Sequence, residues 1–347
     1  MDTHIVIMAG GVGSRFWPMS TPEFPKQFID VLGCGRTLIQ MTYDRVLPLS
    51  RPENIWVVTS SAYLDIVRDQ LPDIPQENIL SEPCPRNTAP CIAYASWKIA
   101  ARHPLAHVVV TPSDALVLDV DAYRRVLSKA LDFTGGTDRI ITVGITPSRP
   151  ETGYGYILSG AAASEGVFKV DAFKEKPSLG VAQSYLEDGR YLWNAGIFVW
   201  DAATIVEALR TYEPQTAGIM DAIAASFYTP GEQQALEDLF PTCPKISIDY
   251  AVMEKSPSIY TIPASFGWSD LGSWGSLRLN SPRDDSGNAA AGPDIHMVEC
   301  EGCIVRTSSL KKVVLQGLEG YIVAENDGSL LVCKLSEEQR IKDFPHL

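Results

Sequence analysis

Apolar and polar positions alternate along the first half of the chain in the manner of strands and helices. Short, continuous apolar runs predict strands at Ile5–Met8, Ile55–Thr59, Asn78–Ser81, His107–Thr111 and Ile140–Ile145. Helix-like segments lie between them at Thr37–Leu47, Ser60–Gln70, Thr88–Ala101 and Val120–Phe133. Strands that are apolar throughout and separated by helices indicate an α/β, Rossmann-like fold with a mixed, mostly parallel sheet. Ligands of such sheets bind beyond the carboxyl ends of the strands.

The pattern changes twice further along. Between about residues 150 and 275, strands predicted at 155–158, 167–173 and 196–200 are interleaved with helices at 179–188 and 202–211. This arrangement predicts an insertion or second lobe on the same core. From residue 282, strand-like pieces at 303–307, 312–315, 321–325 and 330–335 are separated by Gly, Asn and Asp. We therefore predict a catalytic domain over residues 1–281 and a small β module, a short β-helix, over residues 282–347.

The composition of the chain reduces the number of functions that it could have. The 347 residues carry a formal charge of −13, and 45% of them are hydrophobic. Without a basic cluster or a long apolar run, the chain is not expected to bind nucleic acid or to span a membrane. The N-terminus enters an apolar strand without a signal-peptide pattern, and the seven cysteines are irregularly spaced. A cytoplasmic location with reduced thiols is the expectation.

A glycine-rich loop, Gly10–Arg15, directly follows the first predicted strand. Its three glycines would let backbone N–H groups approach an anion closely. The loop lacks the Walker A pattern, and Phe16 stands where a dinucleotide-binding loop needs its third glycine. By itself, the loop fits either a phosphate site or a tight structural turn. Arg15 and Lys26 add the local positive charge that suits a triphosphate.

Eight blocks then follow one another along the chain. The first is GGVGSRFWPMSTPEFPKQF at residues 10–28, and the others lie at 82–90, 112–114, 150–156, 173–177, 193–198, 248–254 and 268–274. In type and order they resemble the sugar-1-phosphate nucleotidyltransferases, and among these the mannose-1-phosphate guanylyltransferases. The resemblance implies transfer of GMP from GTP to mannose 1-phosphate, with release of pyrophosphate. A sugar phosphate is itself the nucleophile, so the enzyme has only to align two anions and neutralise charge.

The resemblance also implies which residues carry the reaction. Arg15 and Lys26 are the expected catalytic cations, and Mg²⁺ is expected on Asp114 and Asp270. Relatives often have histidine where this chain has Ala115, which bears on the geometry around Asp114. The expected nucleotide-binding residues are Ala9, Gly10, Gly11, Gly13, Ser14, Glu82, Asn87 and Ser113.

Glu82 has a specific expected role, because a carboxylate can accept from the paired N–H donors of guanine. An ion pair with Arg86 is the structural alternative. Asn87 or Thr88 is also expected to cap the following helix.

The sugar phosphate is expected to meet a further set of residues, namely Gly153, Glu175, Lys176, Asn194 and Asp249. Lys176 would hold the phosphate, and Glu175 and Asn194 suit sugar hydroxyls. A surface ion pair for Glu175, a turn for Asn194 and a helix N-cap for Asp249 are the structural alternatives.

Three other functions compete with this one. A different nucleotide or hexose 1-phosphate would keep the fold and mechanism. An NAD-linked oxidoreductase conflicts with the missing third glycine, and a non-catalytic nucleotide sensor conflicts with the retained charged residues. The chain ends at Leu347, before any added isomerase domain, so a single activity is expected. Exposed strand edges of the β module predict a homodimer, with packing of the module against its own catalytic domain as the alternative.

Overall fold

The computed structural model describes residues 2–11 and 13–346, with the backbone alone for Ser14 and His346. The chain divides into two compact units. Unit 1 comprises residues 1–10, 43–113 and 117–268, and unit 2 comprises residues 11–42, 114–116 and 269–347. The chain passes from one unit to the other at the glycine-rich loop, within helix α1 (Leu38–Val46), and at the short strands β5 (Leu116–Val117) and β11 (Trp268–Ser269).

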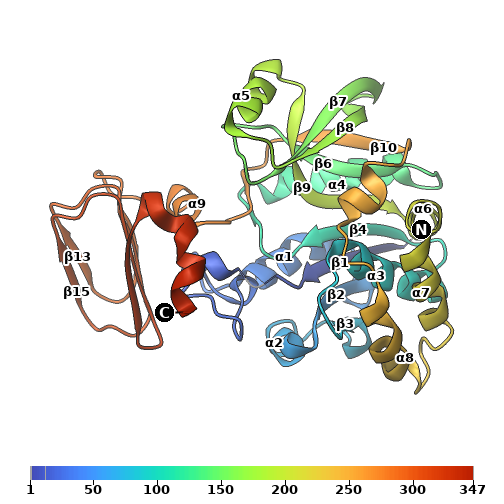
Figure 1. The fold of residues 1–347 in the computed structure, drawn as a ribbon, viewed down its shortest axis with the longest axis horizontal. Coiled ribbons are helices and arrows are strands. Elements are labelled where there is room, and N and C mark those ends of the chain that lie inside the picture. Colours follow the sequence, from blue (N-terminus) through green and yellow to red (C-terminus); the bar gives the residue numbers. More distant parts are fainter. Residues whose placement is uncertain (1, 12, 347) are drawn as a thin grey trace. The chain divides into compact units, whose positions relative to one another are not determined.

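Unit 1 is built on a nine-stranded sheet among the described residues (Figure 1). The strand order is β3-β2-β1-β4-β9-β6-β10-β8-β7. Its strands are β1 (Thr3–Ala9), β2 (Ile55–Ser60), β3 (Ile79–Glu82), β4 (His107–Pro112), β6 (Ile140–Ile145), β7 (Gly155–Ser164), β8 (Val167–Glu175), β9 (Tyr191–Asp201) and β10 (Ile259–Ala264).

The sheet is mixed, as predicted, but it is not mostly parallel, because four neighbouring pairs in its order are parallel and the other four are antiparallel. Strands β3, β2, β1 and β4 are parallel, as are β6 and β10, whereas β9 runs antiparallel to both β4 and β6. The strands of the middle region join this same sheet. The apolar sequence of β9 did not reveal its direction, because a strand buried on both faces is continuously apolar whichever way it runs.

Helices cover the sheet of unit 1. They are α2 (Leu64–Gln70), α3 (Thr88–Arg102), α4 (Val120–Thr134), α5 (Leu179–Asp188), α6 (Ala202–Tyr212), α7 (Pro214–Ala224) and α8 (Glu232–Leu239). Helices α3, α6 and α7 contact one another and share a core with β1, β2 and β4 that includes Val6, Val58, Val108 and Val110. Helix α4 packs against β6, β9 and β10.

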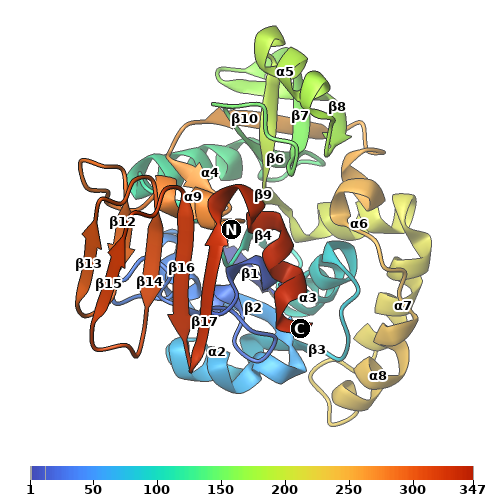
Figure 2. The same cartoon turned by 60° about the vertical axis from the view of Figure 1, so that its left-hand side comes forward.

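Unit 2 joins the segment after the glycine loop to the C-terminal strands. Its elements are the 3₁₀ turns η1 (Ser14–Phe16) and η2 (Lys26–Phe28), helix α9 (Trp274–Leu279), strands β12 (Ala289–Ala291), β13 (Ile295–Val298), β14 (Ile304–Thr307), β15 (Val313–Gln316), β16 (Tyr321–Asn326) and β17 (Ser329–Lys334), and the closing helical segment η9 (Leu335–His346). One small sheet has the order β12-β14-β16-β17, and β13 pairs with β15 (Figure 2).

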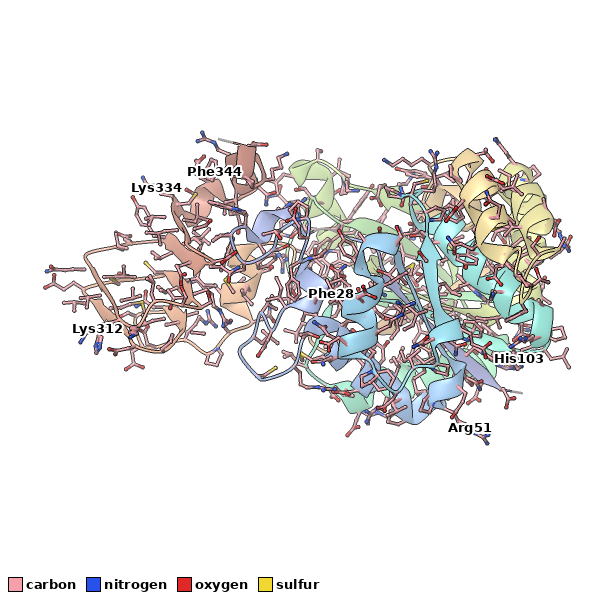
Figure 3. All side chains as sticks on the ribbon, turned by 90° about the horizontal axis from the view of Figure 1, so that it is seen from below. Phe28, Arg51, His103, Lys312, Lys334 and Phe344 are labelled. Atoms are coloured by element: carbon pink, nitrogen blue, oxygen red, sulfur yellow. The ribbon has the colours of Figure 1, made fainter. Side chains whose placement is uncertain are left out.

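One core runs through unit 2. Buried side chains from the first segment, such as Phe16 and Leu38, pack in the same cluster as Trp274, Ile322 and Ile341. Lys312 and Lys334 lie on the outside of the C-terminal strands (Figure 3). The predicted boundary between residues 281 and 282 stays a prediction. Within unit 2, the strands after it share their hydrophobic core with the segment that carries Arg15.

Candidate active site

The glycine-rich loop follows β1, as predicted. Gly13 has a φ of 65°, and a Cβ placed there would lie 2.6 Å from Lys26 Cβ, so a larger residue would clash with the backbone-proximal part of that lysine. Gly11 O accepts a 2.8 Å hydrogen bond from Gln27 Nε2. Val12 and the side chain of Ser14, one of the predicted nucleotide ligands, lie outside the described residues.

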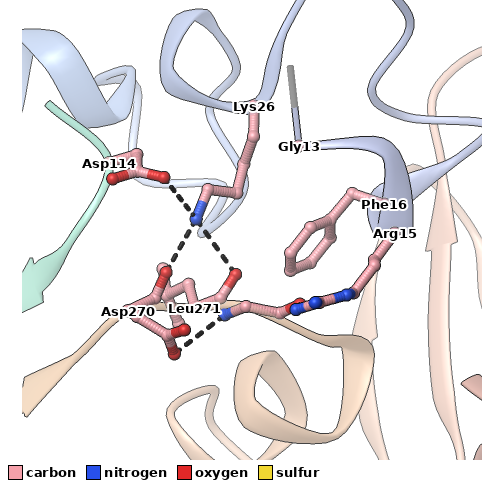
Figure 4. A pocket seen from close by; sticks show the side chains of 8 residues that line it. Gly13, Arg15, Phe16, Lys26, Asp114, Asp270 and Leu271 are labelled. Carbon is pink, nitrogen blue, oxygen red and sulfur yellow. Dashed lines mark hydrogen bonds and ion pairs between the residues drawn. The ribbon is translucent and has the colours of Figure 1, made fainter. Parts of the chain in front are cut away.

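A pocket of about 310 Å³ in unit 2 brings together the four charged residues predicted for the triphosphate and the metal (Figure 4). Its lining consists of Gly13, Arg15, Phe16, Lys26, Asp114, Asp270, Leu271 and Gly272. These residues come from three stretches that are far apart in the sequence.

Lys26 is the most constrained charge in this pocket, because its side chain is only 4% exposed. Its ammonium group donates to the backbone carbonyls of Asp270 at 2.7 Å and Leu271 at 3.1 Å, and pairs with Asp114 Oδ2 at 2.9 Å (Figure 4). An ammonium has three N–H donors, so these three acceptors satisfy it. Lys26 therefore joins the stretch that carries Asp114 to the stretch that carries Asp270.

Arg15 lies across the same pocket and is exposed. Its Nη1 donates to Gly272 O at 3.3 Å, and the side chain lines the pocket (Figure 4). Leu271, between Asp270 and Gly272, has a φ of 43°, which is unusual for a side chain of this kind. Such backbone strain is often found where a turn has to present functional groups.

Asp114 and Asp270 are suited to a hard divalent cation. The Asp114 side chain is 40% exposed, and Asp270 Oδ1 accepts a 3.0 Å hydrogen bond from Gly272 N. Both carboxylates line the pocket beside Arg15, and Mg²⁺ commonly takes one or two carboxylates with phosphate oxygens and water. The described residues contain no cluster of three or more metal-binding side chains. The donor set thus fits a cation shared with phosphates. Ala115, next to Asp114, is buried.

Glu82 ends strand β3 in unit 1 and is buried. Its Oε2 would lie 3.7 Å from a Cβ placed on Gly10, and its Oε1 has no hydrogen-bond partner among the described residues. Burial raises the pKa of Glu82 to about 8. The alternative ion pair with Arg86 is not formed, because Arg86 Nη2 donates to the carbonyl of Pro241.

Three other predicted nucleotide ligands of unit 1 make hydrogen bonds that hold the backbone around them in place. Asn87 caps α3, as expected: its Oδ1 accepts from Thr88 N at 2.8 Å, and its φ is 70°. Ala9 ends β1, and its carbonyl accepts from Thr59 Oγ1 at 3.0 Å. Ser113 is buried directly after β4, and its N donates to Met8 O at 3.0 Å.

Four of the five residues predicted for the sugar phosphate lie together in unit 1. Asn194 Nδ2 donates to Asp249 Oδ1 at 2.8 Å. A Cβ placed on Gly155 would lie 2.6 Å from Glu175 Oε2 and 3.6 Å from Asn194 Cβ, so these two side chains flank the same glycine. Glu175 Oε1 in turn pairs with Lys176 Nζ at 2.7 Å.

The structural alternatives for these residues can be compared with the geometry. The N-cap position of the turn Asp249–Met253 is Ile248, with no side-chain cap, so Asp249 is available to Asn194 instead. Burial raises the pKa of Asp249, opposed by the Asn194 hydrogen bond and reinforced by the negative charge of Glu175. The ion pair of Glu175 with Lys176 does form. Gly153 N donates to Glu151 Oε1 at 3.0 Å and is exposed.

The sequence did not single out three residues that lie beside the predicted sugar and phosphate residues, namely Thr142, Tyr154 and Gly272. Thr142 is fully buried in β6, and its Oγ1 donates to Asn194 Oδ1 at 3.2 Å. A lone hydroxyl in the otherwise apolar run 140–145 was the available signal. Tyr154 packs its ring edge-on against Trp193 at 5.3 Å and Trp268 at 5.4 Å. No pattern in the sequence pointed to Gly272 as the acceptor for Arg15.

Comparison with known proteins agrees with this geometry. Residues 4–285 match the nucleotidyl transferase family model. The chain is 35% identical over 345 residues to xanthan biosynthesis protein XanB of Xanthomonas campestris, covering 99% of this chain and 72% of that protein. It is 34% identical over 349 residues to mannose-1-phosphate guanylyltransferase 2 of Escherichia coli O157:H7, covering 97% and 71%.

A solved structure extends the likeness to the whole fold. A Thermus thermophilus protein described as mannose-1-phosphate geranyltransferase superposes with a TM-score of 0.89 at 30% identity, covering 100% of this chain and 99% of that one. The chain therefore belongs to the nucleotidyl transferase family, a class of enzymes. Among the described residues, no helix is both long enough and apolar enough to cross a membrane.

Proposed function

We propose that this chain transfers GMP from GTP to mannose 1-phosphate, forming GDP-mannose and pyrophosphate. The observation that carries the proposal is the unit 2 pocket, where Arg15, Lys26, Asp114 and Asp270 meet. The choice of substrates is supported by the relatives, which include enzymes named mannose-1-phosphate guanylyltransferase.

The reaction needs no protein nucleophile. A phosphate oxygen of the sugar phosphate attacks the α-phosphorus of the nucleotide, the bond from that phosphorus to the α–β bridging oxygen breaks, and pyrophosphate leaves with the electron pair. A phosphate monoester is largely dianionic near neutral pH because its second pKa is about 6. The enzyme therefore lowers the barrier by alignment and charge neutralisation.

Arg15 and Lys26 are the cations proposed to hold the triphosphate, and Ala9, Gly10, Gly11, Gly13 and Ser14 are the proposed nucleotide-binding residues of the glycine-rich loop. Arg15 has the fork geometry for two phosphate oxygens, and most of its guanidinium is accessible. The ammonium group of Lys26 lies in the pocket and forms an ion pair with Asp114 there. If Asp114 turns to a cation, one N–H of Lys26 becomes available to a phosphate oxygen.

Mg²⁺ is the proposed metal, held by Asp114 and Asp270. When bound, it would neutralise charge on the phosphates of the nucleotide. The support is the oxygen donor set and its place beside Arg15 and Lys26 in one pocket. Asp270 is held for this role by its own turn, because Gly272 N donates to its Oδ1.

GTP is the proposed nucleotide because of Glu82. A deprotonated carboxylate can accept hydrogen bonds from the N1–H and N2–H₂ groups of guanine, and Glu82 Oε1 is buried without another partner among the described residues. A buried acceptor of this kind discriminates strongly, since a base without matching donors leaves it unsatisfied. Asn87 and Ser113 are proposed to line the same base and ribose region.

Mannose 1-phosphate is proposed to meet Gly153, Glu175, Lys176, Asn194 and Asp249. The partly buried carboxylate of Asp249 and the amide of Asn194 already share a hydrogen bond, so a hydroxyl could donate to the first and accept from the second. Lys176 has a φ of 45° and an exposed ammonium group, which suits contact with the sugar's phosphate.

Three further features are proposed for this chain: a short β-helix, a homodimer and a cytoplasmic location. The parallel pairing of β12 with β14, of β14 with β16 and of β13 with β15 supports a short β-helix at the C-terminus. A homodimer through this module is supported by the edge strand β17, which exposes Leu330 and Val332. Seven free cysteines support a cytoplasmic location.

The test is release of pyrophosphate from GTP and mannose 1-phosphate, compared with ATP, UTP and glucose 1-phosphate. The proposal predicts a kcat/KM at least about 100-fold higher with GTP than with ATP, because the wrong base leaves Glu82 unpaired. Equal rates with ATP, or a preference for glucose 1-phosphate, would contradict the choice of substrates while leaving the class of reaction intact.

A further inference from the structure

The C-terminal segment supplies contacts to both loops of the phosphate pocket. Helix α9 begins four residues after Asp270, and the N–H groups of its first turn need acceptors. Ser273 accepts from Ser276 N at 3.2 Å within a capping box. Gly275 N instead donates to Glu338 Oε2 at 2.7 Å, and Glu338 belongs to the closing segment η9.

The contact at Gly275 is close and specific. A Cβ placed on Gly275 would lie 3.3 to 3.4 Å from the two carboxylate oxygens of Glu338, so the carboxylate sits directly on this backbone position. The same short stretch of chain presents Asp270 to the pocket and Gly272 O to Arg15. Leu271 within it is held at a φ of 43°, a conformation that surrounding contacts must maintain.

A second contact reaches the loop that carries Arg15. Asn326 Nδ2, at the end of β16, donates to Pro18 O at 3.1 Å. Asn326 is itself oriented by Ser308, whose Oγ donates to Asn326 Oδ1 at 3.0 Å. Pro18 lies just after η1, the turn that presents Arg15 and Phe16 to the pocket.

The hydrophobic core joins the same two loops to the C-terminus. Phe16 lies 5.4 Å from Trp274, ring centre to ring centre, and both share a buried cluster with Ile322 and Ile341. Ile341, in η9, is fully buried. Interiors are packed tightly enough that such contacts fix the position of the backbone they cover. The C-terminal strands and η9, which supply these contacts, lie beyond residue 285, where the match to the family model ends.

We propose that Glu338 and Asn326 are positioning residues for the phosphate and metal site: Glu338 holds the turn of Asp270, and Asn326 holds the loop of Arg15. The C-terminal module is then a working part of the pocket. This inference rests on the proposed function. It requires that loss of either hydrogen bond weakens binding of the metal nucleotide and leaves the sugar phosphate site, in unit 1, unaffected.

The test is calorimetric titration of the full-length chain with Mg·GTP, together with the KM for mannose 1-phosphate. Glu338→Ala should raise the Kd for Mg·GTP about 10-fold, since small displacements of positioned groups are costly. Glu338→Gln keeps an oxygen that accepts from Gly275 N and should bind like wild type. Glu337→Ala is the matched control, because Glu337 is exposed and pairs with Arg340 on its own segment. The KM for mannose 1-phosphate should stay unchanged in all three.

A second variant keeps the inference falsifiable if Glu338→Ala does not fold. Asn326→Asp retains the acceptor for Ser308 but cannot donate to Pro18, and it should also weaken Mg·GTP binding without changing the KM for mannose 1-phosphate. The inference is overturned if folded Glu338→Ala or Asn326→Asp binds Mg·GTP as wild type does, or if both substrates are affected equally. Failure of wild type itself to bind Mg·GTP would instead refute the proposed function, and the inference with it.

Discussion

The two units handle charge in opposite ways. In the unit 2 pocket, a lysine and an arginine stand beside two aspartates, and the lysine is satisfied by backbone carbonyls and one carboxylate. In unit 1, the predicted base and sugar residues include two carboxylates whose pKa values are raised, the buried Glu82 and the partly buried Asp249. The first arrangement suits phosphates and a cation, and the second suits neutral N–H and O–H donors.

This difference shows how an acidic protein can bind anionic substrates. The net charge of −13 disfavours anions at a distance, but Arg15 and Lys26 provide positive charge at one point. The carboxylates for neutral donors are in the other unit and desolvated, which makes each hydrogen bond they accept more selective.

Arg15→Ala should reduce kcat/KM about 1000-fold, because it removes a preorganised cation from the phosphate pocket. Arg15→Lys keeps the charge but loses the fork and should recover only part of the activity. Initial rates of pyrophosphate release measure the effect, and melting temperatures should be close to that of wild type because Arg15 is exposed. An unchanged rate in a folded Arg15→Ala protein would rule out the role.

Glu82 should make GTP binding pH-dependent. With a pKa of about 8, its carboxyl is mostly protonated at pH 6 and must lose the proton to accept from guanine. Affinity of the wild type for GTP should therefore rise at least about 10-fold between pH 6 and pH 8, one pKa unit being a factor of ten. Titrations of Glu82→Gln over the same pH range measure the part of the pH dependence that comes from protonation of the triphosphate itself.

Glu82 should also make the stability of the fold depend on pH, in the opposite direction to GTP binding. The folded-state pKa of Glu82 is raised above its unfolded value, so the folded protein loses stability as the pH rises from about 4.5 towards 8. Glu82→Gln should therefore melt higher than wild type at pH 9 and alike at pH 4.5. Glu77→Gln, at an exposed position on the same segment, is the control. A GTP affinity in Glu82→Gln equal to wild type at pH 8 would refute the guanine contact.

Asn194→Ala should raise the KM for mannose 1-phosphate about 10-fold, because it leaves the partly buried Asp249 carboxylate without its hydrogen bond from Asn194. The KM for GTP should not change, since no predicted triphosphate residue contacts Asn194. Steady-state kinetics with each substrate varied in turn separates the two. Parallel increases in both KM values would show that the sugar residues and the phosphate pocket are not independent.

Thr142→Val should have the smallest effect, about 3-fold on the KM for mannose 1-phosphate. The substitution is nearly isosteric and removes one neutral hydrogen bond, that from Thr142 Oγ1 to Asn194 Oδ1. Asn194 keeps its bond from Gly196 N at 3.1 Å, so its orientation is only partly lost. A larger effect than that of Asn194→Ala would contradict an indirect role.

The sequence predicted strands β1 to β4 and β6 of unit 1 well, because they are buried along most of their length and are therefore mainly apolar. Strands β7 and β9 are several residues longer than predicted. Strand β6 and helix α5 have the predicted bounds, and β1 to β4 differ from theirs by one or two residues. Strand β10 was missed, since Pro263 interrupts the apolar run Ile259–Ala264. Helices α7 and α8 were also missed, although a proline at the start of α7 and the helix-forming residues EQQALEDL of α8 were available signals.

The candidate residues were predicted by type, but not by what holds them in place. The triphosphate and metal residues do share one pocket, yet the bond of Lys26 to the Asp270 and Leu271 carbonyls depends on a turn with a left-handed leucine. A leucine gives no sequence signal for that conformation. Likewise, the contacts of Glu338 and Asn326 join residues that are far apart in the sequence, and only the folded chain reveals them.

We propose that the charged pocket takes metal and phosphate, while the carboxylates of unit 1 take the neutral donors, Glu82 those of guanine and Asp249 those of the sugar. The most direct test is to measure the Mg²⁺ activation constant and the KM for mannose 1-phosphate in Asp114→Asn and Asp249→Asn. We predict that Asp114→Asn raises the Mg²⁺ activation constant at least about 10-fold and leaves the KM for mannose 1-phosphate unchanged. Asp249→Asn should raise the KM for mannose 1-phosphate and leave the Mg²⁺ activation constant unchanged. Equal changes of both constants in either variant would contradict the account.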